Sequence, residues 1–305
     1  MAVTLGYEEL RAVTQELARV LEGSTFVGSS QVDRYRVLLE FERPDGVGKK
    51  VLVCTEVHLA RLHLTEGQFA SSKPNAFVKQ LNGIRDSVLS GLKVLYRDRV
   101  VNFLLTRRRE RYNLLFECSG HHPNLYLLDA HFRILGFLNP PTSKKRRLEV
   151  GMPYQKPLPH EGSEVVQMRF VDHGQGLSTK VEAWYAEEEE RVTRVRKTAE
   201  ARRELKAALF RLVELANDLD RDLAKQRRAA EMLSGGAVSE EKRERFSRLS
   251  QALPGTRRRK QVVEREVERL KRILAELRYD NLEESLAAAK RALARCGRGR
   301  PRGRR

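Results

Sequence analysis

The sequence has few of the residues that stabilise small secreted domains or build membrane spans. Its three cysteines, Cys54, Cys118 and Cys296, are odd in number and far apart, which predicts neither a disulfide framework nor a metal-binding pair. No apolar run approaches the ~20 residues that a spanning helix requires. The first residues, MAVTLGYEEL, lack the basic and apolar regions of a signal peptide. We therefore expect a soluble, cytoplasmic protein with no membrane partner.

Patterns that would indicate catalysis are also missing. The seven histidines form no HExxH motif, no paired-carboxylate site and no Ser/His/Asp order, and no glycine-rich phosphate loop occurs. His121 and His122 could bind a metal, but adjacent residues of a strand point to opposite faces, which favours a loop contact instead. The sequence predicts no enzymatic activity, no cofactor and no metal site.

What the sequence has in abundance is positive charge. It holds 59 Lys and Arg against 41 Asp and Glu, a net charge of +18. Such a surplus favours a polyanionic partner, because each Lys or Arg placed on a phosphate releases condensed counterions. The excess is shared: residues 1–160 hold 24 basic against 16 acidic residues, and the remainder 35 against 25. Both parts are expected to touch the polyanion.

Residues 1–160 are predicted to form one α+β domain, because ~150 residues suffice to bury a sheet-based core. Apolar residues at helical spacing predict an amphipathic helix that ends at Gly23, and 75–89 reads as one or two helices. Three hairpins are expected. Their strand pairs are 35–41 with 51–54, 99–105 with 112–117, and 125–129 with 134–138.

A linker, residues 161–177, separates this domain from a predicted all-α antiparallel coiled-coil hairpin over 178–295. Two seams of apolar residues alternate at three and four positions. They are Leu205, Leu209, Leu212, Ala216, Leu219 and Leu223, and then Val263, Val267, Leu270, Leu274 and Leu277. The connection is expected between Ser234 and Gly255. Because each seam finds its partner in the same chain, a monomer is favoured, although an intermolecular dimer stays open.

The last residues, 296–305, are predicted to be a disordered Arg/Gly tail. Seven arginines lie between Arg291 and Arg305, and the segment has no apolar side chains to offset the entropy of ordering. Contact with RNA phosphates or bases is favoured over a purely solubilising role, because arginine dominates the segment.

The stretch YRDRVVNF, residues 96–103, carries the most information. Its Asp98-Arg99 step opens a predicted strand. Taken alone, the step reads as a surface ion pair worth ~0–1 kcal/mol. The alternative is recognition, because a guanidinium can fork onto phosphate or a base edge while a carboxylate accepts from base amino groups. The residues by themselves favour the ion pair.

Read with VCTEVHLARLHLT (53–65), FECSGHHPNLYLLD (116–129) and RLEVGMPYQKP (147–157), this stretch resembles the N-terminal domain of the NFACT family. The family includes RqcH- and NEMF-type factors and is also called the fibronectin-binding protein A N-terminal domain family. The resemblance implies a glycosylase-like sheet with helices, and binding of large ribosomal subunits, through rRNA, that carry a stalled nascent chain, together with tRNA. The chain would be a reduced member without the family's C-terminal RNA-binding domain.

The resemblance implies that Asp98 and Arg99 engage tRNA, and it adds further residues that match positions of the family pattern. The arginines of the basic hairpin tip are included as well. The RNA-binding residues predicted in this way are Arg61, Arg97, Asp98, Arg99, Arg107, Arg108, Arg109, Arg111, Glu117, Asn124 and Arg147. Leu81-Asn82-Gly83 and His121-His122-Pro123 depart from the family pattern. A DNA-binding protein on a glycosylase-like fold, a surface adhesin and a coiled-coil scaffold are the alternatives, and a start at Met1-Ala2 offers no proline nucleophile for glycosylase chemistry.

Overall fold

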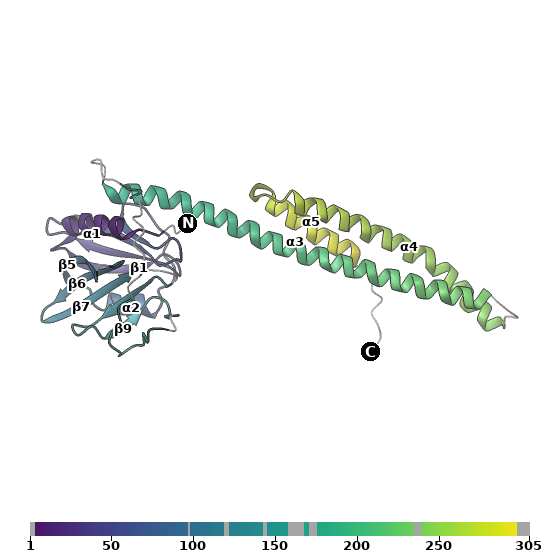
Figure 1. Ribbon diagram of the computed structural model, residues 1–305, viewed down its shortest axis with the longest axis horizontal. Helices are drawn as coiled ribbons and strands as arrows, with labels where there is room; N and C mark the ends of the chain where they lie inside the picture. Colours follow the sequence, from purple (N-terminus) through teal and green to yellow (C-terminus); the bar gives the residue numbers. More distant parts are fainter. Residues whose placement is uncertain are drawn as a thin grey trace. The chain divides into compact units, whose positions relative to one another are not determined.

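A computed structural model describes residues 4–96, 98–118, 122–142, 145–157, 168–170, 176–234 and 239–297. The chain divides into two compact units, residues 1–189 (unit 1) and 190–305 (unit 2). Unit 1 contains all of the β-structure in the described residues, and unit 2 is helical there (Figure 1).

The described part of unit 1 contains one antiparallel sheet of nine strands in the order β4-β3-β2-β1-β5-β6-β7-β8-β9. The strands are β1 Thr25–Gln31, β2 Arg36–Glu42, β3 Gly48–Cys54, β4 Arg61–Thr65, β5 Ser87–Leu95, β6 Val100–Arg107, β7 Glu110–Glu117, β8 Asn124–Leu128 and β9 Ile134–Phe137. The short helix α2, Ala76–Asn82, contacts both β1 and β9, which are five places apart in the sheet. The sheet therefore curls around α2.

All three predicted hairpins are confirmed: β2 pairs with β3, β6 with β7 and β8 with β9. The first turn uses Gly46, whose φ of +79° a side chain would oppose. In the third, Asp129 Oδ1 accepts hydrogen bonds from the backbone of His131 and Arg133 at 2.8 and 2.9 Å. Local turn chemistry explains why these elements could be found from sequence.

The prediction of helix through residues 75–89 is wrong beyond α2. Asn75 caps α2 through its side chain, which accepts from the Val78 amide at 2.9 Å. Strand β5 then begins at Ser87. Its alternation is broken by a register shift between Leu89 and Gly91, so its apolar residues take on a spacing that imitates a helix. Strands β1 and β4 were also not predicted.

The helix predicted near the N-terminus is confirmed as α1, Tyr7–Leu21, and it packs on β4 and β5. Leu10, Val13, Leu17 and Leu21 are fully buried on one face. On the same helix Glu9 is buried and takes a two-pronged contact from Arg169, with nitrogen-to-oxygen distances of 3.0 and 2.7 Å. Burial alone would raise the pKa of Glu9, but the hydrogen bonds from Arg169 and the Gly6 amide lower it.

Helix α3, Leu177–Ser234, begins in unit 1, where its first turns cover the edge strand β4. Glu16 accepts from the amides of Leu177 and Ser178 at 2.8 Å each, so a carboxylate compensates the free N–H groups of the helix start. Ser178 Oγ in turn accepts from the Leu64 amide of β4 at 2.9 Å. The helix thus satisfies an edge that would otherwise be open to pairing.

Two buried amides fix the register of the β6–β7 hairpin. Asn102 Nδ2 donates to Asn113 Oδ1 at 2.9 Å, and Asn113 Nδ2 donates to the Asp129 carbonyl at 3.0 Å. A slip of one residue between the two strands would place these two amides on opposite faces of the sheet. It would also leave their partners unsatisfied in the core, which is costly.

In unit 2, α3 runs beside α4, Glu240–Ala275, and a third helix, α5, Leu282–Gly297 (Figure 1). The predicted seams are confirmed as the core, and α5 adds to it. Its buried members include Leu205, Leu212 and Leu219 of α3, Val263, Val267 and Leu270 of α4, and Leu282, Ala289 and Ala292 of α5. The seams are therefore packed within one chain.

The predicted break at Pro254-Gly255 is wrong, because both residues lie inside α4. Proline removes one backbone hydrogen bond and frees the carbonyl of Ser250. Residues 250–260 are exposed or half-buried, so water can take that carbonyl. The helix hairpin was expected to end the folded region, but the chain turns again after Ala275. There Asn281 accepts from the Arg278 amide at 2.8 Å and donates to the Glu276 carbonyl at 3.0 Å, before α5 begins.

Within the described residues, no helix combines the length and the apolar character needed to cross a membrane.

One histidine should make the stability of unit 1 depend on pH. His63 on β4 is fully buried, and burial and then Arg61 lower its pKa to about 4. The unfolded chain takes up this proton near its ordinary pKa of about 6.5, so stability is lost as pH falls from about 6.5 toward 4. Between pH 7 and 5 we expect the free energy of unfolding to fall by about 2 kcal/mol from this group.

Urea unfolding at both pH values tests this. His63→Phe should remove that part of the pH dependence, whereas His131→Gln, at an exposed turn, should leave it in place. Equal pH dependence in the wild type and His63→Phe would contradict the assignment.

Candidate nucleic-acid interface

Most of the residues predicted from the sequence to bind RNA lie at one end of the sheet. Val100 pairs with Glu117 and with Leu95, and Glu117 pairs with Asn124, so the Asp98-Arg99 turn lies beside the end of β7 and the start of β8. Two side-chain contacts bring the other half of the sheet to the same place. Cys118 Sγ donates to the Ala60 carbonyl at 3.2 Å, and Asn139 Nδ2 donates to Thr55 Oγ1 at 3.1 Å. We call this end the strand-end surface.

The basic hairpin tip lies at the opposite end. Strands β6 and β7 carry the chain from Arg99 to the tip over eight residues, or about 25 Å at ~3.3 Å per residue. Arg108, Arg109 and Arg111 are exposed there. Arg107 is bound to its own domain, with Nη1 donating to the Gly83 carbonyl at 2.8 Å. The structure therefore separates the predicted RNA-binding residues into two surfaces.

The Asp98-Arg99 turn is not a closed ion pair. Asp98 Oδ1 accepts from the Arg99 amide at 2.6 Å, and Arg99 Nη1 donates to Thr4 Oγ1 at 3.2 Å. Among the described residues no ion pair involves either side chain, and both are half-exposed. Next to the turn, the ammonium of Lys156 lies 5.9 Å from the centre of the exposed Tyr96 ring. Arg97, which was also predicted to bind RNA, lies outside the described residues.

Glu117 is an internal anchor. It is fully buried and receives a two-pronged ion pair from Arg146, with both nitrogen-to-oxygen distances 2.8 Å, and a hydrogen bond from Tyr154 Oη. The hydrogen bonds with Glu117 raise the pKa of Arg146, and burial followed by the charge of Glu117 raises the pKa of Tyr154. Glu117 can therefore act on RNA only by holding Arg146 and its segment in place.

Asn124 and Arg61 are internal as well. The Asn124 side chain accepts from the amides of Leu125 and Asn139 and donates to the Asn139 carbonyl at 2.7 Å. Arg61 is 4% exposed and donates to Glu189 of α3 at 2.6 Å, with its guanidinium 4.6 Å from the centre of the Tyr185 ring. Asn124 and Arg61 therefore support the strand-end surface from inside the fold and are not exposed on it.

Arg147, the last of the predicted residues, is exposed and pairs with Glu149 at 3.0 Å. Its neighbour Arg146, which sequence analysis did not single out, makes the buried contact with Glu117. The available signal was the run Lys144-Lys145-Arg146-Arg147. The run comes after β9 in the sequence, and the buried carboxylate of Glu117 at the end of β7 requires a cation from it.

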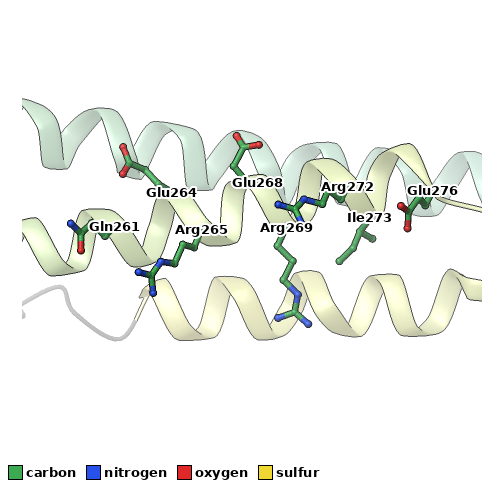
Figure 2. Close-up of a pocket in the computed structure, with 8 residues that line it drawn as sticks. All are labelled: Gln261, Glu264, Arg265, Glu268, Arg269, Arg272, Ile273 and Glu276. Carbon is green, nitrogen blue, oxygen red and sulfur yellow. The ribbon is translucent and has the colours of Figure 1, made fainter.

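Unit 2 offers a second concave surface, a groove of about 830 Å³ along α4. Figure 2 shows Glu264 and Glu268 extending to one side of the helix and Arg265 and Arg269 to the other. Acidic and basic side chains alternate along the groove. It therefore presents no single sign of charge to a polyanion.

The described residues contain no group of three or more His, Cys, Asp or Glu able to hold a metal ion. The three cysteines are unpaired thiols. Burial raises the pKa of Cys54 to about 11 and that of Cys118 to about 12, so neither thiol is poised as a nucleophile at neutral pH.

The fold is an α+β domain built on one curled antiparallel sheet, followed by helices that pack on each other. Residues 8–170 match the NFACT N-terminal and middle domains, more than half of the chain. The chain belongs to the NFACT family, which spans ribosome quality control factors and fibronectin-binding proteins.

Among solved structures, the chain is similar to the N-terminal part of the fibronectin/fibrinogen-binding protein of Streptococcus suis, with 23% identity and a TM-score of 0.47 over 50% of this chain and 61% of that one. It is also similar to the N-terminal domain of the fibronectin-binding protein PavA of Streptococcus pneumoniae, with 19% identity and a TM-score of 0.46 over 51% and 65%. The aligned part thus spans less than two thirds of these relatives. A search of curated proteins found no match.

Removing the buried carboxylate of Glu117 should destabilise the fold around the strand-end surface. In Glu117→Gln we expect the free energy of unfolding to fall by about 3 kcal/mol, because the change leaves Arg146 buried without its counter-charge. Chemical denaturation measures this. Glu149→Gln is the matched control, because its carboxylate also pairs with an arginine but is exposed, and its effect on the free energy of unfolding should be much smaller. A loss in Glu117→Gln no larger than in the control would contradict the anchoring role.

Proposed function

We propose that this chain is a cytoplasmic, non-catalytic RNA-binding factor of ribosome quality control. In this role it binds the large ribosomal subunit, through rRNA, when that subunit carries a stalled nascent chain, and it engages tRNA. One observation carries the proposal: the Asp98-Arg99 turn stands at the end of the sheet with atoms of both side chains open to a ligand, in a chain of the NFACT family.

The strand-end surface and the hairpin tip have different roles in RNA binding. The strand-end surface combines a half-exposed carboxylate and guanidinium with an exposed aromatic ring, groups that read base edges and stack on bases. The hairpin tip offers Arg108, Arg109 and Arg111, exposed cations without recognition geometry around them. The tip therefore serves the phosphate backbone, which supplies affinity without sequence information.

The helical unit supports a monomeric factor. The seams that could have drawn a second chain are covered by α4 and α5 of the same chain. The buried Glu266 of α4 is paired with Arg295 of α5 at 2.5 Å, which closes the third helix onto the hairpin.

Charge reversal at the tip should weaken RNA binding without changing which RNA is bound. For Arg108→Glu with Arg109→Glu we expect weaker binding of every RNA, with the slope of log affinity against log salt reduced by about 1.5 to 2. Arg11→Glu with Arg19→Glu, an equal charge change on the exposed face of α1, is the control. If the two double variants lose the same affinity and slope, net charge alone is responsible and the tip has no special part.

The turn should control selection. We expect wild-type protein crosslinked in cells to enrich large-subunit rRNA and tRNA, and Asp98→Ala and Arg99→Ala to lose the tRNA while keeping the rRNA. Sequencing of the crosslinked RNA measures both. If neither RNA is enriched over bulk RNA at moderate salt, the proposed function fails.

Immobilised fibronectin provides the counter-test, because the similar solved proteins are named for binding it. Retention on fibronectin at concentrations where no ribosomal subunit co-sediments would favour an adhesive role over the one proposed.

A further inference from the structure

A cavity of about 260 Å³ opens on the strand-end surface, beside the residues discussed above. It is formed where four segments meet: the approach to β2, the loop after β3, the approach to β8 and the segment after β9. Its volume lies below the ~300–1,000 Å³ of pockets for drug-sized ligands. The occupant is therefore about one ring system with small substituents.

The walls of this cavity are apolar and aromatic. Pro123, Pro140, Pro141 and Val57 line it together with Tyr35. Apolar faces of this kind accept a flat aromatic ring, because stacking requires a dry surface rather than a particular polar partner.

A few polar atoms remain available along the walls. Asn139 uses its Nδ2 to donate to Thr55, and within the described part of the chain its Oδ1 accepts no hydrogen bond. His122 contacts Thr142 through Nδ1 at 2.6 Å, which leaves Nε2 for a ligand. These atoms can meet the donors and acceptors on the edge of a heterocyclic base.

The charge around the cavity is positive. Among the described residues that line it there are two arginines and no Asp or Glu. Arg146 is compensated by Glu117, but Arg34 is exposed, pairs with no described carboxylate and lies 5.3 Å from the centre of the Tyr35 ring. A neighbouring hollow of about 490 Å³ shares Pro141 and adds Lys145 and Arg147. An anion attached to the ring would be held at the rim.

We propose that this cavity binds one unstacked nucleotide of a single-stranded RNA, with the base between the proline and tyrosine walls and the adjoining phosphates on Arg34 and Lys145. The proposal rests on the RNA binding proposed above and names the unit of RNA that the strand-end surface recognises. It adds a site built from residues that neither the Asp98-Arg99 turn nor the hairpin tip contains.

Filling the cavity tests this directly. Val57 is 38% exposed at its mouth, so Val57→Trp can enter the space without disturbing the core. We expect Val57→Trp to weaken binding of a single-stranded RNA decamer about tenfold, in line with the loss of one stacked base. Binding of a decamer of abasic ribose phosphate, which has the same charge and no bases, should not change. Val195→Trp, at a 61% exposed position of α3, is the control and should bind both decamers like the wild type.

A second variant addresses the phosphate. Arg34→Glu should weaken both decamers by a similar factor, because it acts on the backbone, and Arg19→Glu on α1 should change neither. Unchanged melting temperatures establish that each variant is folded. If Val57→Trp weakens binding of both decamers, or of neither, the proposal is wrong.

Titration with the four nucleoside 5′-monophosphates separates the sources of the ligand. If Val57→Trp abolishes binding of a monophosphate but does not weaken binding of the RNA decamer, the cavity binds a free nucleotide and the proposal of a base within RNA is wrong. Co-sedimentation with ribosomal subunits keeps the two proposals apart. If the protein binds ribosomal subunits but Val57→Trp affects the two decamers equally, the cavity site alone is rejected. If Val57→Trp has the predicted effect on the decamers but the protein binds no subunits, the ribosomal role alone is rejected.

Discussion

Two buried carboxylates and one buried arginine, each paired with an oppositely charged side chain from a distant part of the chain, attach segments outside the sheet to the sheet or to helix α1. Glu9 binds Arg169, Glu117 binds Arg146, and Glu189 binds Arg61. A buried carboxylate without its arginine would carry a desolvation cost of several kcal/mol. The geometry of each pair is therefore specified as strictly as that of the apolar core. These pairs in turn fix the positions of the segments that form the strand-end surface.

This arrangement changes the meaning of the high positive charge. Part of the arginine content is consumed inside unit 1, where it compensates carboxylates and has no contact with a ligand. The exposed cations include those of the hairpin tip and those around the strand ends, with others elsewhere on unit 1. Net charge predicts an anionic partner as a class of chemistry, but the location of the charge available to such a partner depends on which arginines the fold itself requires.

The sequence predicted the elements whose signals are local. Turn residues marked the three hairpins, and the spacing of leucines marked α1 and the seams of the helical unit. Elements that depend on tertiary context were missed: β5 because a bulge disturbs its alternation, β4 because Arg61 and His63 interrupt its apolar residues although the fold buries both, and α5 because no break was expected after Ala275.

The same limit applies to the site. The positions chosen by resemblance lie together at the strand ends, but position in a family pattern carries no information about exposure, so Arg61, Glu117 and Asn124 were assigned to a ligand although the fold buries them. Arg146 was missed for the opposite reason. Four consecutive cations look equivalent in a sequence, and only the buried Glu117 distinguishes one of them. The cavity could not be foreseen, because its walls come from four segments that meet only after the sheet curls.

The paired amides of Asn102 and Asn113 give the β6–β7 hairpin a property beyond stability. Because they forbid a slip by one residue, the hairpin acts as a ruler between the Asp98-Arg99 turn and the arginine tip. Its length can change without exchanging the inward and outward faces only in steps of two residues on each strand. Relatives that vary this hairpin should therefore differ by multiples of four residues, and each step would move the two surfaces apart by about 7 Å.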